Sequence, residues 1–182
     1  SPITLTNSDY RFIVREQLKQ IKVDLGSIII EPKKKNTAPA ILAATLFDFT
    51  ENEQKTLLVM PSDHVIPNND AFLKAVKKGY QEVKKGKIVT FGVKPSFPET
   101  GYGYIEVEDS SSENPKNIKK FIEKPNLKDA KKMASSDNYF WNAGIFMFRA
   151  KDMISAYQNF SPSLMLSVKN AIKKGEFDLD FF

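Results

Sequence analysis

The residues best suited to chemistry come directly after short apolar runs of the chain. The run TLLVM is followed by Ser62, Asp63 and His64. A single carboxylate at the tip of a buried strand suits Mg²⁺, which takes one or two carboxylates and completes its coordination with phosphate oxygens and water. The alternative is that Asp63 or Ser62 caps the following turn. At this point the pattern supports both interpretations equally.

The chain lacks the side chains that several common active sites need. His64 is the only histidine, which excludes a histidine-based metal cage and leaves a Ser-His-Asp triad with one candidate base. We expect His64 to be packed or hydrogen-bonded. Neither GxGxxG nor GxxxxGK occurs, so a nucleotide site here would have no glycine-rich phosphate loop. The absence of cysteine excludes disulfides and suits, without proving, a cytoplasmic protein.

A second polar cluster, PKKKNTAP, follows the apolar run at residues 27–31 and leads into an apolar stretch. Thr37 can cap a helix there, and Pro39 suits its first turn. The free backbone donors at a helix start also favour an anion or the edge of a base. Capping alone explains the pattern, and Lys33 to Lys35 could contact phosphates or form a solvated turn.

The stretch PETGYGYIEV is either a bend before a strand or a contact surface for a ligand. Strand alternation places Tyr102 and Tyr104 on one face and Gly103 on the other. At Gly103 the missing side chain would let a ligand approach the backbone.

Two further motifs combine charged or amide side chains with a strand. Glu123 and Lys124 precede Pro125, and in a regular strand their side chains point to opposite faces. A shared ligand therefore requires the chain to turn there, and the alternative is a surface charge pair. In WNAG, Asn142 and Gly144 precede an apolar run. This pattern fits a packed aromatic strand with a bulge at Gly144, or a sugar platform on which Asn142 bonds a hydroxyl.

The elements that would position these residues alternate between apolar strands and amphipathic helices. Helices are expected from Asn7 or Ser8 to Gly26, over residues 38–49, 68–85 and 127–134, and twice after residue 150. Strands are expected over residues 27–31, 56–60, 88–93, 102–108, 119–124 and 140–148. The first three strands predict a doubly wound α/β core with a parallel sheet, and residues 102–124 predict an added antiparallel pair.

Both ends of this predicted arrangement are abrupt. The first expected element is a helix with no strand before it, and residues 177–182 have no closing structure. We therefore expect a fragment of a longer chain.

The composition limits the number of domains and the classes of partner. The chain has 182 residues with 41% hydrophobic content, which suits one domain with a substantial core. No run approaches the roughly 20 apolar residues of a membrane span. The net charge of +5 could indicate nucleic-acid binding, but the lysines occur in scattered pairs. We expect a solvated surface, no nucleic acid and no membrane as partners.

Taken in order, five motifs resemble the bacterial mannose-1-phosphate guanylyltransferases of the sugar-nucleotidyltransferase superfamily. They are NTAPAI, LLVMPSDHVI, FGVKPSFPETGYGYI, FIEKP and FWNAGIFMF, and the similarity runs from about Asn7 to Ala150. The resemblance implies a Rossmann-like nucleotide-diphospho-sugar transferase fold of the α/β class, with a mostly parallel central sheet flanked by helices. It also implies conversion of GTP and mannose 1-phosphate to GDP-mannose and pyrophosphate.

On the nucleotide side, the resemblance implies a role for five residues. Asp63 would hold the catalytic Mg²⁺ against the α-phosphate, and Ser62 would lie beside it. Glu31, Asn36 and Thr37 would face the guanine and its ribose.

On the sugar side, the resemblance implies roles for five others. Gly103 would bring backbone to the mannose, and Glu123 would accept hydrogen bonds from sugar hydroxyls. Lys124 would neutralise the sugar phosphate, so that it joins Asp63 in the catalytic set. Asn142 and Gly144 would close on the ring.

The resemblance also implies an incomplete nucleotidyltransferase domain over residues 1–182. Its nucleotide-side core would span about 1–93, its sugar-binding part about 94–150 and its trailing helices 151–182. The family's glycine-rich loop and a second metal-binding aspartate are absent, so we expect the chain alone to be inactive. Lys35 stands where many relatives have arginine. Two alternatives to this function are a sibling transferase with another base or sugar and a non-catalytic nucleotide-sugar-binding module. The parent chain could also carry a mannose-6-phosphate isomerase domain or form a homo-oligomer.

Overall fold

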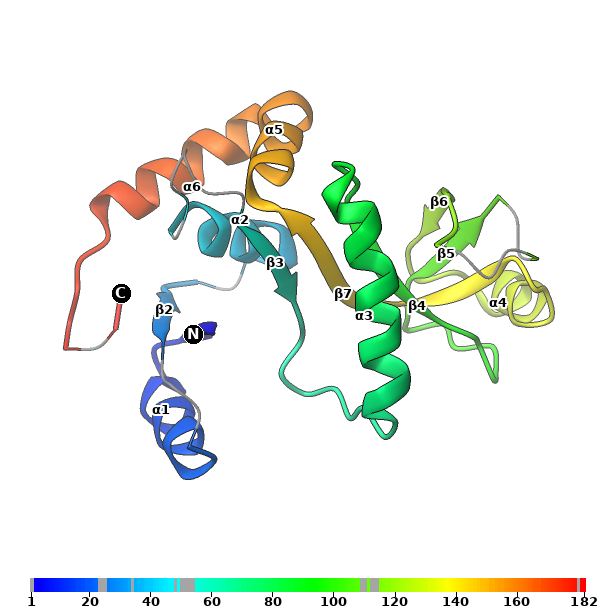
Figure 1. Cartoon of the computed structure of the whole chain (residues 1–182), viewed down its shortest axis with the longest axis horizontal. Helices are drawn as coiled ribbons and strands as arrows, with labels where there is room; N and C mark the ends of the chain where they lie inside the picture. The colour runs from blue at the N-terminus through cyan, green and yellow to red at the C-terminus, as the bar shows by residue number, and fades with distance from the viewer. Residues whose placement is uncertain are drawn as a thin grey trace. The chain divides into compact units, whose positions relative to one another are not determined.

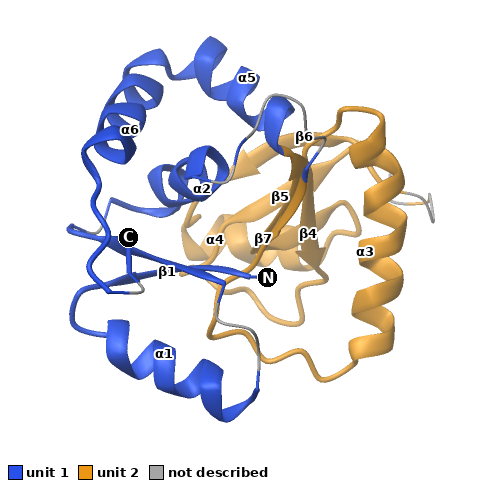
Figure 2. Ribbon diagram, turned by 60° about the vertical axis from the view of Figure 1, so that its left-hand side comes forward, with its two compact units in different colours: residues 1–55, 150–182 blue, residues 56–149 orange. Residues whose placement is uncertain are grey.

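The computed structural model describes residues 2–22, 26–33, 35–47, 49, 55–108, 111, 115–179 and 181–182. Its elements follow one another in the order β1 (Ile3–Asn7), α1 (Arg11–Gln20), β2 (Ser27–Glu31), α2 (Thr37–Phe47), β3 (Thr56–Val59), α3 (Asn69–Lys84), β4 (Val89–Val93), β5 (Tyr104–Val107), β6 (Ile118–Ile122), α4 (Leu127–Ala134), β7 (Tyr139–Arg149), α5 (Ala150–Phe160) and α6 (Pro162–Lys174) (Figure 1). The chain divides into two compact units (Figure 2). Unit 1 contains residues 1–55 and 150–182, and unit 2 contains residues 56–149.

Unit 1 contains a parallel pair of strands, β1 and β2, with α1 as the crossover between them. The expectation of a first helix with no preceding strand is wrong, because Ile3–Asn7 forms β1. Apolar Ile3 and Leu5 alternate there with threonine, as in a half-buried strand. Asn7 does not cap α1. Its Oδ1 accepts the backbone N–H of Asp9 at 3.0 Å and of Tyr10 at 3.2 Å, which makes a turn before the helix.

The last residues of the chain extend this small sheet. The backbone N–H of Phe182 donates to the Ile28 carbonyl at 2.9 Å, and Ile30 N–H donates to the Phe182 carbonyl at 2.7 Å. Phe181 packs edge-on against Phe12, with ring centroids 5.5 Å apart. The expectation that the end of the chain lacks closing structure is therefore wrong, because β2 pairs with Phe181 and Phe182.

Helices form the apolar core of unit 1. Leu42 of α2, Ile154 of α5 and two residues of α6, Met165 and Val168, make one buried cluster. The sequence of α2, TAPAILAATLF, has no charged residue, and four of its residues are buried. The helix is therefore covered on several sides, as its composition predicts.

Unit 2 contains a five-stranded antiparallel sheet with the order β3-β7-β5-β6, and β4 also pairs with β7. Phe146 and Met147 of β7 pair with β3 on one edge and with β4 on the other. Since both neighbours are antiparallel to β7, β3 and β4 run in the same direction, as predicted, without pairing with each other. The α/β class and the antiparallel pair β5–β6 are confirmed. The sheet is not mostly parallel as expected, because β7 lies between β3 and β4.

The helices of unit 2 follow their sequence signals closely. α3 begins after Asn68, whose side chain accepts the backbone N–H of Ala71 at 2.9 Å, as an N-cap does. Gly79 of α3 lets the helix approach the sheet, because a Cβ there would lie 3.1 Å from Met147 and 3.2 Å from Val89. α4 has the predicted bounds. None of the described helices is both long and apolar enough to cross a membrane.

Candidate functional site

Three of the predicted sugar-side residues lie in one row across the sheet of unit 2. Tyr104 pairs with Ile122 of β6 and with Trp141 of β7. Continued by one residue, this register places Gly103 between Glu123 and Asn142. The backbone agrees, because Asn142 N–H donates to the Gly103 carbonyl at 2.8 Å. We call Glu123, Gly103 and Asn142 the site row.

The glycine at the centre of the site row is required by its neighbours. A Cβ at Gly103 would lie 2.9 Å from Oε2 of Glu123 and 3.7 Å from Cβ of Asn142. Any side chain there would push the Glu123 carboxylate away. The missing side chain at Gly103 therefore makes room for the Glu123 carboxylate, and the approach of a ligand to the backbone there stays a prediction.

The amide of Asn142 is oriented by two neighbours. Its Oδ1 accepts the backbone N–H of Gly144 at 3.2 Å, and the hydroxyl of Thr90 lies 3.3 Å from the same oxygen. The Thr90 hydroxyl also lies 3.1 Å from the carbonyl oxygen of Ile145 and has one proton to donate to either acceptor. Because its oxygen is engaged, Asn142 presents its NH₂ group as a donor.

Thr90 was not predicted from sequence, although a signal was available. It is the one hydroxyl residue inside the otherwise apolar strand VTFGV. Polar groups that are withdrawn from water need hydrogen-bond partners, so the position of Thr90 in a partly buried strand predicts a partner on a neighbouring element.

Gly144 joins this group of residues to the turn after β3. It has a φ of +66°, in the left-handed region that favours glycine. Thr90 pairs with Phe146 and Gly92 pairs with Asn142, so two steps along β4 match four steps along β7. β7 therefore bulges at this point, which is one of the two interpretations of the WNAG motif. A Cβ on Gly144 would lie 3.5 Å from Cγ of Pro61. Pro61 directly precedes Ser62 and Asp63, so their turn begins beside the bulge.

Trp141 supports the interpretation of the WNAG motif as part of a packed aromatic strand. Its ring contacts Phe97 and Tyr102 edge-on, with centroids 4.9 and 5.5 Å apart. Since neighbouring strand residues point to opposite faces, Trp141 and Asn142 lie on different sides of β7. A platform built from both side chains is therefore not formed, and only Asn142 belongs to the site row.

Asp63 and Ser62 are exposed in a turn that follows β3. Across the described ranges, no group of three histidine, cysteine or acidic residues could hold a metal by itself. An exposed single carboxylate nevertheless fits Mg²⁺, because this ion takes one or two carboxylates and obtains its other ligands from phosphate and water. His64 was expected to be packed or hydrogen-bonded; it is exposed, so the packed alternative is wrong.

Lys124 occupies a strained backbone position at the end of β6. Its φ is +43°, an uncommon value for a residue other than glycine. The chain thus turns directly after Glu123, which is the condition that a shared ligand for Glu123 and Lys124 requires. Pro125, the next residue, is buried and holds the turn.

The predicted nucleotide residues of unit 1 lie between β2 and α2. Asn36 has a φ of +67°, and Thr37 is the first residue of α2 rather than its cap. Glu31 ends β2 and is partly buried, and this burial raises the pKa of its carboxyl. A largely apolar cavity of about 790 Å³ is lined by Glu31 together with Arg11, Lys33 and Lys35. This cavity is large enough for a nucleoside and has cations at its wall.

The site residues suit charge neutralisation and positioning. They offer carboxylates, a lysine, an amide donor and free backbone groups, but no activated nucleophile. Three of them, Asn36, Lys124 and Gly144, have left-handed backbone conformations. Such conformations often occur at functional sites, although Lys22 and Leu179 share them elsewhere.

Comparison with known proteins gives a consistent result. The family model described as nucleotidyl transferase matches residues 1–182. Among curated proteins, the xanthan biosynthesis protein XanB of Xanthomonas campestris pv. campestris (strain B100) is 40% identical over 181 residues, which are 100% of this chain and 38% of that protein. The mannose-1-phosphate guanylyltransferase of Sinorhizobium fredii is 37% identical over 100% of this chain and 36% of its own length. The chain thus spans less than two fifths of these relatives.

Solved structures share the fold. The mannose-6-phosphate isomerase from Helicobacter pylori has a TM-score of 0.84 and 29% identity, covering 98% of this chain and 68% of its own. A structure described as mannose-1-phosphate geranyltransferase from Thermus thermophilus has a TM-score of 0.78 and 25% identity, covering 96% of this chain and 50% of its own.

Proposed function

Because the chain belongs to the nucleotidyl transferase family, we propose that it serves the transfer of GMP from GTP to α-D-mannose 1-phosphate, giving GDP-mannose and pyrophosphate. The guanylyltransferase named above supports this substrate pair. Since the chain spans about two fifths of such relatives, we assign to it the residues that hold the substrates rather than the complete reaction.

The site row is the observation that carries the sugar side of the proposal. Gly103 lets the Glu123 carboxylate lie over the backbone at the centre of the row, where it would accept hydrogen bonds from sugar hydroxyls. Asn142 lies at one end of the row and can donate to a hydroxyl oxygen, because its own amide oxygen is engaged by Gly144. Lys124, at the turn after Glu123, would neutralise the sugar phosphate, and Gly144 would help to close on the ring.

The reaction needs few chemical groups from the protein. An oxygen of mannose 1-phosphate attacks the α-phosphorus of GTP, and the bond from that phosphorus to the bridging oxygen breaks to release pyrophosphate. The attacking oxygen is anionic at neutral pH, so no strong general base is required. Positioning and charge neutralisation provide the catalysis.

On the nucleotide side, Asp63 would hold Mg²⁺, with Ser62 beside it, and the bound ion would neutralise charge on the α-phosphate. Asn36 and Thr37 would face the guanine or its ribose through the free backbone donors at the start of α2. Glu31 would accept hydrogen bonds from the base. We propose a cytoplasmic location for this reaction.

A GDP-mannose titration with and without Mg²⁺ tests the proposal. We expect Mg²⁺ to strengthen binding to the wild type and not to Asp63→Ala. Asp70→Ala, which removes an exposed carboxylate of α3, is the matched control and should keep the effect. Equal binding by wild type and Asp63→Ala would undo the metal assignment. A thermal-shift comparison with UDP-glucose and dTDP-glucose tests the choice of base and sugar.

The expected inactivity of the 182-residue chain stays a prediction. Pyrophosphate release from GTP and mannose 1-phosphate measures it directly, and turnover by the chain alone would show that the prediction is wrong.

A further inference from the structure

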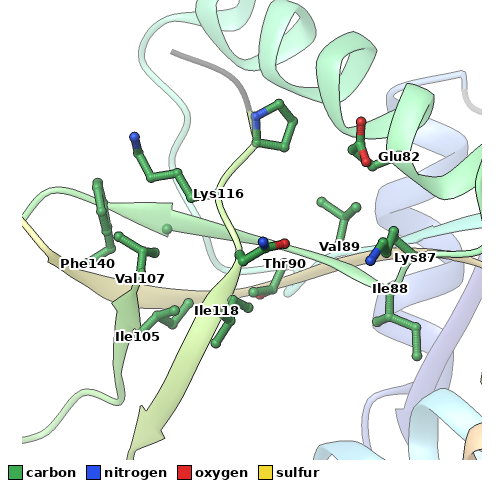
Figure 3. A pocket seen from close by; sticks show the side chains of 13 residues that line it. Glu82, Lys87, Ile88, Val89, Thr90, Ile105, Val107, Lys116, Ile118 and Phe140 are labelled. Carbon is green, nitrogen blue, oxygen red and sulfur yellow. The ribbon is translucent and has the colours of Figure 1, made fainter. Parts of the chain in front are cut away.

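A cavity of about 330 Å³ lies in unit 2 beside the site row (Figure 3). Its floor is apolar and is made by Ile105, Val107, Ile118 and Phe140. Ile105 follows Gly103 by two positions, and Phe140 precedes Asn142 by two positions, so they share a face of the sheet. The cavity therefore continues the face of the site row without containing any of its three residues.

A glycine shapes one wall of this cavity. A Cβ at Gly92 would lie 2.7 Å from Cβ of Phe140, too close for any side chain. Gly92 thus lets Phe140 lie directly against β4, where its ring forms part of the apolar floor. Aromatic and branched aliphatic side chains of this kind suit contact with a flat apolar ring.

The rim of the cavity carries positive charge. Lys87 and Lys116 both line it, and Figure 3 shows Lys116 above Phe140 and Val107, with Lys87 at the other end beside Ile88 and Val89. Among the described residues that line the cavity, Glu82 is the one carboxylate, and its Oε1 is already paired with Nζ of Lys85 at 2.7 Å. A ligand that complements the apolar floor and Lys87 would combine an apolar ring with a single anionic group.

Thr90 connects the cavity to the site row. It lines the cavity, and its hydroxyl lies within hydrogen-bond distance of both Asn142 Oδ1 and the Ile145 carbonyl. Its single proton can go to only one of these acceptors at a time. A ligand that contacts Thr90 would change this choice and could thereby alter the hydrogen bonding that orients the Asn142 amide.

We propose that this cavity is an effector site for a small amphiphilic anion, an apolar ring bearing one carboxylate, sulfonate or phosphate group, and that Thr90 couples its occupancy to Asn142. The binding part of this proposal is independent of the proposed function. The coupling part rests on the proposed function, since it concerns binding of GDP-mannose at the site row.

The first experiment is a titration of the 182-residue chain with 1-naphthalenesulfonate, followed by amide NMR shifts. We expect saturable shifts at residues around the cavity, including Gly92 and Asn117. Ile118→Trp fills the cavity and should abolish them, whereas Phe121→Trp, on the same strand but outside the cavity, should keep them. Shifts confined to Glu31 and Phe182, or equal binding by both variants, would overturn the proposal. Because the shift map uses the wild type, it remains decisive if Ile118→Trp does not fold.

The charge of the rim is tested separately. Lys87→Gln should weaken 1-naphthalenesulfonate binding by about twofold to fivefold, as expected for an exposed charge pair. It should leave binding of neutral 1-naphthalenemethanol unchanged. Lys74→Gln, on the exposed side of α3 and outside the cavity, should change neither. If Lys87→Gln weakened the binding of both compounds equally, the cavity would not require an anionic group on its ligand.

The coupling is tested by titrating GDP-mannose with and without saturating 1-naphthalenesulfonate. We expect the affinity to change by about fivefold or more in the wild type, within the usual range of coupling energies. Thr90→Val should lose this change, and Thr90→Ser should keep it. An unchanged affinity in the wild type would overturn the coupling alone. Absence of any GDP-mannose binding would overturn the proposed function and the coupling, while the NMR result on the cavity would stand.

Discussion

The two compact units assemble their site residues in different ways. In unit 1, the candidate residues Glu31 to Thr37 belong to one short connection between β2 and α2. In unit 2, the site row is assembled by strand pairing, and β7 reaches back to β3 through the pair Thr56–Arg149. One set of residues is adjacent in the chain, and the other is adjacent only in the fold. Changes to strand packing should therefore damage the second set more than the first.

The largest expected effect comes from the core of unit 2. Phe148 is fully buried in β7, and Phe148→Ala should cost about 3–5 kcal/mol of unfolding free energy. It should also weaken binding of the sugar part, because β7 carries Asn142. Leu42→Ala, at a fully buried position of unit 1, should cost about 2–5 kcal/mol. Urea unfolding measures both, and a cost below about 1 kcal/mol for Phe148→Ala would contradict the assigned core.

A smaller effect is expected where the backbone is left-handed. Gly144→Ala should cost roughly 1–2 kcal/mol, because its φ of +66° disfavours a Cβ. It should also weaken GDP-mannose binding, because Gly144 donates to Asn142. Asn36, with a φ of +67° in unit 1, is the matched position. Asn36→Gly should leave unfolding unchanged or slightly improved, and a large loss there would show that the asparagine side chain stabilises the turn.

At the centre of the site row we expect a change in affinity with little change in stability. In Gly103→Ala, the nearest atom to the new Cβ is Glu123 Oε2, the movable end of an exposed side chain. The carboxylate should move aside, so that GDP-mannose binds less tightly while the thermal midpoint stays close to wild type. Gly101→Ala, whose Cβ would approach Glu99 Oε1 at 3.2 Å, is the control. A large drop in the midpoint for Gly103→Ala would return Gly103 to a purely structural role.

The smallest effect compares one carboxylate from each unit. The pKa of Glu31 is raised by burial, so its stabilising contribution is present below about pH 4.5 and is lost as pH rises through its folded value. The pKa of Glu106 is lowered, first by its hydrogen bond to Lys119 at 2.7 Å. Its contribution is present above about pH 4.5 and is lost as pH falls through its folded value. At pH 7, Glu31→Gln should stabilise slightly and Glu106→Gln should destabilise slightly. Urea unfolding at pH 7 and pH 4 checks both signs.

The local elements of both units could be predicted from sequence because their signals are local. The spacing of apolar residues gave α3 and α4 almost to the residue, and Asn68 marked the start of α3. β1 was missed because its five residues stand directly before a helical pattern, and the helix expected from Asn7 or Ser8 left residues 3–6 without an element. The pairing of β7 between β3 and β4 could not be predicted, since it depends on contacts between residues far apart in the chain.

The types of site residue could be predicted better than their contacts. Gly103, Glu123 and Asn142 were chosen from three separate motifs, and only the register of β5, β6 and β7 shows that they form a row. Their roles stay predictions. Thr90 was missed because a hydroxyl in a strand indicates a need for a partner without saying which one it has.

The bulge in β7 also determines which changes of length this strand can tolerate. Relative to β4, β7 has two additional residues between Asn142 and Phe146. Because side chains alternate, an even number of additional residues keeps every later side chain on its original face. Deleting both Ala143 and Gly144 should therefore leave a folded chain with a straightened strand, whereas deleting either one alone would exchange buried and exposed side chains along half of β7. Insertions and deletions in this segment should survive only in pairs.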